Sequence, residues 1–250
     1  MPQRFIHCLT ILLFTVIALP FAHTVVAEDD FVRSEEFDQR IRDYLLENPE
    51  VIMESVQRFQ VEQQRAQADR AQQAVLSRRD EIFNNPDDPV AGNPAGDVTV
   101  VEFMDYNCPY CRKAYKSLLQ LTKDDPNIKL LFKEMPVLGE GSEFAARAAL
   151  AAQQQNLYMA FHNALMEFNG RLNEQAILSI AEQSGLNVDQ LKQDMTDPKI
   201  QATIDRNMQL AQALGVRGTP AFVIGDEVVR GAADLNKLKQ SVAKARKADK

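Results

Sequence analysis

The chain has 250 residues and a formal net charge of −7 at pH 7, with 45% hydrophobic and 25% charged residues. This composition is ordinary for a folded protein, and the length accommodates one sizeable core with an appended segment. Because the balance of charge is acidic and no cluster of basic residues interrupts it, the sequence argues against nucleic-acid binding.

The first residues are organised like a secretory signal peptide. Arg4 precedes an apolar stretch, Cys8–Ala22, and small or aliphatic residues then lead to Ala27 and an acidic run. An apolar stretch of about fifteen residues that is interrupted by Pro20 is short for a membrane span. We therefore predict that residues 1–27 are a cleaved signal peptide and that the mature protein is exported to the periplasm. Cleavage after Ala22 and an uncleaved anchor are the alternatives.

Residues 28–83 have a helical pattern with few apolar residues that could be buried in a core. One apolar stripe runs from Phe37 to Leu45, Pro49 restarts the chain, and a second stripe ends at Phe59. The residues beyond Phe59 are mostly Gln, Ala, Arg and Glu, which form helices well but bury little apolar surface. Either this is a solvated helix lying on its own domain, or residues 31–60 join copies of the chain and residues 61–83 form a stalk.

Residues 84–96 read as a linker between this leader and a catalytic domain. The segment holds three prolines, two glycines and three asparagines, which favour turns and loops. The catalytic domain is accordingly predicted over residues 97–250.

The central motif of that domain is a strand followed by Cys-Pro-Tyr-Cys. The β-branched run from Val98 predicts a strand buried on both faces, and Pro109 suits the first position of a helix. Cys108 then caps the helix, where free N–H groups and the helix dipole favour a thiolate, and Arg112 lies nearby. Cys111 lies one turn further on the same side. This is the arrangement of a dithiol exchange centre.

The two cysteines could instead belong to a metal site or form a structural disulfide. A zinc site needs four Cys or His ligands, whereas the chain outside the signal peptide offers these two cysteines and His162. A structural disulfide would close a loop too short to constrain the unfolded chain much. Cu(I) binding by the two thiolates is the main alternative. His162 itself is interpreted as a packing residue.

The remaining elements follow in a clear order. Residues 128–134 predict a second strand, and residues 142–214 a helical block whose first helix is capped by Ser142. Two short strands, 221–224 and 228–230, and a final helix, 235–247, complete the chain. The order is a βαβ unit and a ββα unit separated by a helical insertion, which is an α/β fold.

The Cys108-Pro-Tyr-Cys111 helix start, the Gly218-Thr-Pro220 run and the helical insertion resemble the thioredoxin superfamily, and most closely its DsbA-like exported disulfide oxidoreductases. The resemblance implies a thioredoxin-like fold and a reversible Cys108–Cys111 disulfide, with no cofactor. Cys108 would attack substrates and Cys111 would resolve the intermediate. Pro220 would be a cis-proline that presents the backbone of Thr219 to the substrate.

Two further candidate residues directly follow the attacking cysteine, and an acid precedes it by six residues. Pro109 and Tyr110 are candidate substrate contacts, and Tyr110 stands where the family's strong oxidase has His, which argues against a strongly oxidising potential. Glu102 matches a buried acid that such proteins keep near the resolving cysteine. Either it transfers a proton to and from Cys111, or it pairs with Lys129 or Lys133 of the next strand.

The leader resembles that of proteins similar to the suppressor of copper sensitivity protein C, in the run FDQRIRDYLLENPEVIMESVQ. This resemblance implies a homo-oligomer that acts as a disulfide isomerase or reductase on misfolded exported proteins and depends on a membrane thiol reductase or oxidase. A dithiol oxidase is the first alternative function. A periplasmic Cu(I)-binding protein or a chaperone module without redox turnover is the second.

Overall fold

The computed structural model describes residues 35–248. The predicted signal peptide, residues 1–27, lies outside the described residues. The chain divides into two compact units with the boundary between Val56 and Gln57. Within the described residues, no helix is both long enough and apolar enough to cross a membrane.

The first unit consists of helix α1, Glu35–Glu47, and the beginning of helix α2, Pro49–Ser77. Pro49 opens α2, as its fixed backbone angle favours. No residue of α1 is buried. Large apolar side chains of both helices are exposed, including Ile41 and Ile52 at 45% each and Leu46 at 67%. The described residues of this unit, 35–56, therefore form no buried core.

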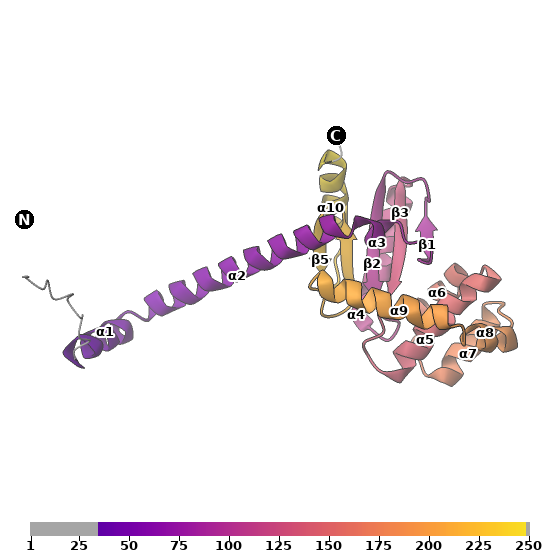
Figure 1. The fold of residues 1–250 in the computed structure, drawn as a ribbon, viewed down its shortest axis with the longest axis horizontal. Helices are drawn as coiled ribbons and strands as arrows, with labels where there is room; N and C mark the ends of the chain where they lie inside the picture. The colour runs from indigo at the N-terminus through magenta and orange to yellow at the C-terminus, as the bar shows by residue number, and fades with distance from the viewer. Residues whose placement is uncertain (1–34, 249–250) are drawn as a thin grey trace, which may run out of the picture. The chain divides into compact units, whose positions relative to one another are not determined.

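The second unit is built on a five-stranded sheet with the order β1-β3-β2-β4-β5 (Figure 1). The central pair, β2 and β3, is parallel, and the other pairs are antiparallel. The predicted thioredoxin-like βαβ and ββα arrangement is confirmed, with one antiparallel edge strand added. The strands are β1 Val90–Gly92, β2 Val98–Met104, β3 Ile128–Glu134, β4 Ala221–Ile224 and β5 Glu227–Arg230.

Helices cover both faces of the sheet because β2 and β3 send apolar side chains to each side in alternation. Val100 and Met104 of β2 join a cluster with α4 and α10, whereas Val101 and Phe103 join one with α2, α3 and the end of α9. The covering helices are α3 Arg79–Phe83, α4 Pro109–Asp124 and α10 Leu235–Ala248.

The predicted helical insertion lies between β3 and β4. Its first helix is capped by Gly139 rather than Ser142, because Ser142 already lies within the first turn and is buried. Asn173 and Asp197 are the N-caps of two later helices of this block, and the side chain of each accepts a backbone N–H. The insertion comprises α5 Glu140–Ala152, the 3-10 turn Gln153–Gln155, α6 Tyr158–Glu167, α7 Glu174–Gln183, α8 Val188–Asp194 and α9 Pro198–Ala213.

Residues 84–96, which the sequence predicts as a linker, are part of the catalytic unit. They contain β1, which pairs with β3, and Asp88, whose carboxylate binds the buried ammonium of Lys133. The end of α2 also belongs to this unit, since Ala71 and Val75 are buried against it. The predicted linker is therefore corrected to an edge strand with a buried ion pair.

Candidate active site

The two cysteines lie where β2 passes into α4. Cys108 is the N-cap of α4, with extended backbone angles of φ −81° and ψ 115°, and Pro109 occupies the first turn. The N–H groups of Cys111 and Arg112 donate to the Cys108 carbonyl at 3.1 and 3.2 Å. The backbone N–H groups of Tyr110 and Cys111 at this helix start interact with the Cys108 thiol and favour its ionised form.

Two polar residues that sequence reasoning did not single out hold the turn before Cys108. The carboxylate of Asp105 accepts the backbone N–H groups of Val137 and Leu138 at 2.8 and 3.1 Å. The side chain of Asn107 exchanges two hydrogen bonds with the backbone of Leu172, at 3.1 and 2.9 Å. The turn is thus fixed both to the loop after β3 and to the helical insertion. Asp and Asn are typical turn residues, and this was the available signal.

Arg112 also joins the turn to the helical insertion by hydrogen bonds. Its Nε donates to the carbonyl of Tyr106 at 3.1 Å and its Nη1 to the carbonyl of Gly170 at 2.9 Å. The sequence predicts that Arg112 helps to lower the pKa of Cys108. The structure gives it this positional role in addition.

Cys108 and Cys111 are both free thiols in the structure, so the predicted disulfide stays a prediction. The pKa of Cys108 is lowered to about 6, mainly by the hydrogen bond from the Cys111 thiol, with help from Thr219 and from the backbone N–H groups of Cys111 and Tyr110. Burial, the hydrogen bond with Cys108 and the charge of Glu102 all raise the pKa of Cys111. One thiol is therefore activated and the other is kept protonated.

The loop before β4 faces the activated thiol. The Cys108 Sγ donates to the carbonyl oxygen of Thr219 at 3.3 Å, and the Thr219–Pro220 bond is cis, as the sequence predicts. On the other side of Cys108, Pro109 is exposed and Tyr110 is 63% exposed. Tyr110 is thus accessible to a substrate chain, whereas Cys111 is fully buried.

Glu102 is buried behind the two thiols. Its side chain leaves β2 on the same face as those of Val100 and Met104, the face against which Cys111 packs. Neither of its carboxylate oxygens has a hydrogen-bond partner among the described residues. Burial, and then the charges of Glu134 and Cys108, raise its pKa well above the usual range. The alternative that Glu102 pairs with Lys129 or Lys133 is wrong. Glu102 lies beside Phe132 in the sheet, so both lysines leave β3 on the opposite face, and Lys133 binds Asp88.

A second buried acid, Glu134, lies at the end of β3 within a cluster of aromatic side chains. Its Oε1 accepts the hydroxyl groups of Tyr106 and Tyr158, each at 2.9 Å. The Nδ1 of His162 lies 3.0 Å from the Tyr106 hydroxyl, and its ring packs 4.4 Å from that of Phe132. Burial raises the pKa of Glu134 to about 8 and lowers that of His162 to about 3.

This cluster is a neutral polar core rather than a set of charges. At neutral pH Glu134 retains a proton in most molecules and His162 is uncharged. The prediction that His162 is a packing residue agrees with its ring contacts to Tyr106, Tyr115 and Tyr158. Glu134 could not be singled out from the sequence, because its hydrogen-bond partners Tyr106 and Tyr158 lie far along the chain.

No group of three or more His, Cys, Asp or Glu side chains within residues 35–248 is arranged to hold a metal ion. The protein groups that converge on Cys108 are instead a second thiol, a backbone carbonyl and backbone N–H groups. A dithiol at the start of a helix, facing a cis-proline loop at the edge of a βαβ–ββα sheet, defines a thioredoxin-like protein.

The chain belongs to the family of DSBA-like thioredoxin domains, whose model matches residues 99–243. Residues 35–67 match a second model, the N-terminal domain of the copper resistance protein ScsC. The predicted resemblances of the catalytic domain and of the leader are both confirmed.

Three solved structures are similar to this chain. A thioredoxin-like oxidoreductase from Silicibacter pomeroyi DSS-3 is 54% identical, with a TM-score of 0.67 over 68% of this chain and 98% of its own. Proteus mirabilis ScsC in a transitional conformation is 30% identical, with a TM-score of 0.66 over 85% of this chain and 96% of its own. The thiol-disulfide exchange protein alpha-DsbA2 from Wolbachia pipientis is 33% identical, with a TM-score of 0.65 over 70% of this chain and 95% of its own.

Similarity also extends to part of a larger protein. The Na(+)/H(+) antiporter NhaA 1 of Salinispora arenicola is 30% identical over 164 residues, which are 64% of this chain. This chain spans a quarter of the length of that antiporter.

Proposed function

We propose that the protein is an exported thiol-disulfide oxidoreductase that acts as a disulfide isomerase or reductase on misfolded exported proteins. The observation that carries the proposal is the pairing of Cys108, whose pKa is lowered to about 6, with the buried Cys111, whose pKa is raised. A thiolate attacks a disulfide and a protonated thiol does not, so this pair assigns the two successive steps to two different cysteines.

In the first step, the Cys108 thiolate attacks a sulfur of the substrate disulfide. A Cys108–substrate disulfide forms, and the other substrate sulfur leaves as a thiolate. In the second step there are two possibilities. Either the freed thiolate attacks another disulfide of the substrate and a substrate thiolate then displaces Cys108 as a thiolate, which rearranges the disulfides without net oxidation, or Cys111 attacks Cys108. The latter releases the substrate as a thiol and leaves the Cys108–Cys111 disulfide, which a membrane thiol reductase must reduce again.

Glu102 is proposed to transfer a proton to and from Cys111. Cys111 must lose its proton before it attacks, and in a buried site the proton needs a nearby acceptor. Glu102 is buried on the same face, interacts electrostatically with Cys111, and has no competing hydrogen bond among the residues described. Burial raises its pKa, so Glu102 must first release its own proton, and the carboxylate that results is a stronger base than an exposed one.

The leader is proposed to join copies of the chain, because apolar side chains of its described residues are exposed. Ile41 and Ile52 are each 45% exposed, and Tyr44 is 55% exposed. Isolated apolar residues on a surface are common, but a succession of them along two helices favours a helix–helix interface. Several active sites on one assembly would suit isomerisation, since a substrate freed from one site meets another at high local concentration.

The experiment is refolding of a disulfide-scrambled test protein by residues 28–250. The matched variants are Ile41→Glu with Ile52→Glu, which charges the apolar stripe, and Gln57→Glu with Gln63→Glu, which adds the same charge at exposed polar positions. We expect light scattering to show an oligomer for the parent and the Gln variant, and refolding to be lost with the oligomer in the Ile variant.

Two results would redirect the proposal. Oxidation of a reduced substrate without unscrambling by any of the proteins identifies a dithiol oxidase. Unscrambling by a monomeric Ile variant at the parent rate contradicts the role of the leader. A truncated comparison should begin at residue 57, because Ala71, Val75 and Asp88 are buried in the catalytic unit and must be kept.

A further inference from the structure

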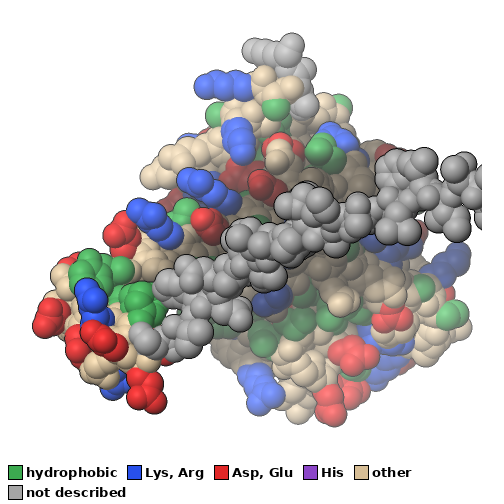
Figure 2. Space-filling view, turned by 60° about the vertical axis from the view of Figure 1, so that its left-hand side comes forward, with side chains coloured by type: hydrophobic (Ala, Val, Ile, Leu, Met, Phe, Trp, Pro, Cys, Tyr) green, Lys and Arg blue, Asp and Glu red, His purple; other side chains and the backbone are tan. Residues whose placement is uncertain are grey.

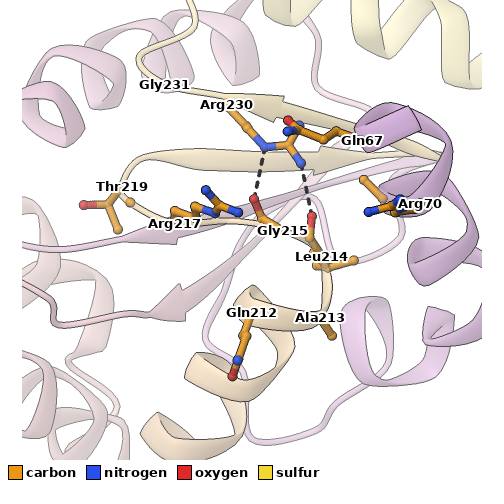
Figure 3. A pocket seen from close by; sticks show the side chains of 12 residues that line it. Gln67, Arg70, Gln212, Ala213, Leu214, Gly215, Arg217, Thr219, Arg230 and Gly231 are labelled. Carbon is orange, nitrogen blue, oxygen red and sulfur yellow. Dashed lines mark hydrogen bonds between the residues drawn. The ribbon is translucent and has the colours of Figure 1, made fainter. Parts of the chain in front are cut away.

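A pocket of about 540 Å³ lies beside the active site, on the side of the loop before β4 (Figure 3). Thr219 lines the pocket and also receives the Cys108 thiol hydrogen bond at 3.3 Å. A substrate chain bonded to Cys108 therefore passes the mouth of this pocket within a few residues of its cysteine. The pocket belongs to none of the steps described above.

The pocket is basic. Arg70, Arg217 and Arg230 line it, and no Asp or Glu of residues 35–248 does so. Figure 3 shows Arg217 and Arg230 between Thr219 on one side and Arg70 of α2 on the other. Acidic and basic side chains are interspersed over the face in Figure 2, and the whole chain carries a net charge of −7. Three arginines without an acid therefore form a local exception.

Two of these guanidinium groups are available to a ligand. Within the described part of the chain, no hydrogen bond or ion pair holds the guanidinium of Arg70 or of Arg217, and both residues are exposed. Arg230 is oriented by its own bonds, because Nε and Nη2 donate to the carbonyls of Gly215 and Leu214 at 3.2 and 3.3 Å. Its Nη1 has no hydrogen-bond partner among the described residues and is available to a ligand.

The wall formed by α2 is fixed to the catalytic unit. Gln67, Ala71 and Val75 are spaced four residues apart and so share one face of the helix. Ala71 and Val75 are buried, and Gln72 donates to the carboxylate of Asp226 in the β4–β5 turn. Arg70 is thus presented to the pocket by packed neighbours rather than by a free helix. The end of α2 therefore forms one wall of the pocket, which is a role distinct from that of a stalk or an oligomer interface.

We propose that this pocket binds acidic side chains of the substrate polypeptide that flank the cysteine attacked by Cys108. The inference rests on the proposed function and adds a substrate class to it: cysteines with Asp or Glu a few residues away. Guanidinium groups bind carboxylates with paired, charge-assisted hydrogen bonds, so several in one concave site select for an anionic chain. The preference would act against the overall acidic charge of the protein, which by itself repels such substrates.

The test is a competition between two peptides on the protein of residues 28–250 carrying Cys111→Ser. The peptides are identical except that one has two Glu, and the other two Gln, beside a single cysteine held as a mixed disulfide with 2-mercaptoethanol. Attack by Cys108 forms the Cys108–peptide disulfide and releases 2-mercaptoethanol as a thiolate, with no net oxidation. Mass spectrometry of the trapped protein gives the ratio of acidic to neutral peptide.

We expect the acidic peptide to be captured about tenfold more often at low salt, and the ratio to fall towards one at high salt. Arg70→Gln with Arg217→Gln should bring the ratio close to one at low salt. The matched control is Lys192→Gln with Lys199→Gln, which removes the same charge. Lys199 is thirteen residues before the pocket residue Gln212 along α9, or about 20 Å of helix. This control should keep the preference.

The failures of the two proposals differ. Equal capture of both peptides by the parent protein, or an undiminished preference in the arginine variant, overturns the pocket proposal and leaves the oxidoreductase intact. A preference lost equally in the lysine control also overturns it, because net charge then suffices. Capture of neither peptide overturns the proposed function and the pocket together.

Discussion

The buried ammonium of Lys133 binds the carboxylate of Asp88, and it also donates to the carbonyl of Glu81 at 2.7 Å. The side chains of Lys133 and Asp88 are 1% and 0% exposed. The pair joins β3 to the segment that leads from α3 into β1, so it fastens the edge of the sheet. Lys133 pairs with Phe103 in the sheet, so its side chain lies on the face opposite that of Glu102.

We expect Asp88→Ala to lower the free energy of unfolding by about 3–5 kcal/mol, because it leaves an unpaired ammonium in the interior. Asp88→Ala combined with Lys133→Met should recover most of that loss. The exposed neighbour Asp87, which pairs with Arg206, is the control, and Asp87→Ala should cost about 1 kcal/mol or less. Urea denaturation measures all four proteins. A loss of under 1 kcal/mol in Asp88→Ala would show that the pair does not fasten the sheet.

The alkylation rate of Cys108 should rise with a midpoint near pH 6, since the reactive species is the thiolate. The largest cause of the lowered pKa is the hydrogen bond from the Cys111 thiol. Cys111→Ala should therefore move the midpoint upward, whereas Cys111→Ser, which keeps a donor, should move it less. Iodoacetamide labelling followed by mass spectrometry gives the profile. A midpoint in the parent near the ordinary thiol value of about 8.5 contradicts this assignment.

Glu102→Gln should slow the resolving step while leaving the fold intact, because Gln has the same shape and cannot accept the proton of Cys111. We expect the release of a peptide from a preformed Cys108–peptide disulfide to fall by about ten- to a hundredfold at neutral pH. The pH dependence of that step should also change. Lys129→Met, which removes the other lysine considered as a partner of Glu102, serves as the control and should keep the parent rate. An unchanged rate across pH in Glu102→Gln excludes the proton-transfer role.

Most of the fold and the position of the dithiol could be predicted from local sequence patterns. The strand Ile128–Glu134 is confirmed to the residue. It contains an apolar stretch, residues 130–132, and is followed by Met135 and Pro136, and proline cannot donate to a sheet ladder. The helix start at Cys108 and Pro109 follows from a motif of a few adjacent residues, whereas the cis bond before Pro220 was implied by the resemblance to the thioredoxin superfamily. Such features depend on neighbours in the sequence, so a single sequence is sufficient to predict them.

The errors came from contacts between distant segments. β1 has three residues and lies among prolines, so nothing in its own sequence distinguishes it from a loop until β3 pairs with it. The face of α2 that packs on the sheet contains Ala71 and Val75 among Gln and Arg, which is too little apolar surface to stand out. The partners of Glu134, Tyr106 and Tyr158, lie 28 and 24 residues away. No periodicity or spacing rule joins them.

The buried acid Glu134 should make the folded protein less stable as the pH rises. Its pKa is about 8 in the folded state against 4.5 for an ordinary glutamate, so the unfolded chain releases this proton first. The stability that the protonated form provides is complete below pH 4.5 and is lost progressively up to pH 8, with a slope of up to about 1.4 kcal/mol per pH unit. His162 has the opposite effect on the acid side, because its pKa is lowered from 6.5 to about 3, and stability is lost as the pH falls through that range.

Glu134→Gln tests this directly, since the amide oxygen still accepts from Tyr106 and Tyr158 but the side chain no longer titrates. Denaturation in urea at a series of pH values between 5 and 8 should give a shallower fall in the free energy of unfolding than in the parent. Part of the fall should remain, because the pKa of Glu102 is also raised by burial. Glu140→Gln, at an exposed position, should reproduce the parent slope. If Glu134→Gln and the parent lose stability equally over this range, Glu134 is ionised in the folded protein and the cluster around it is charged.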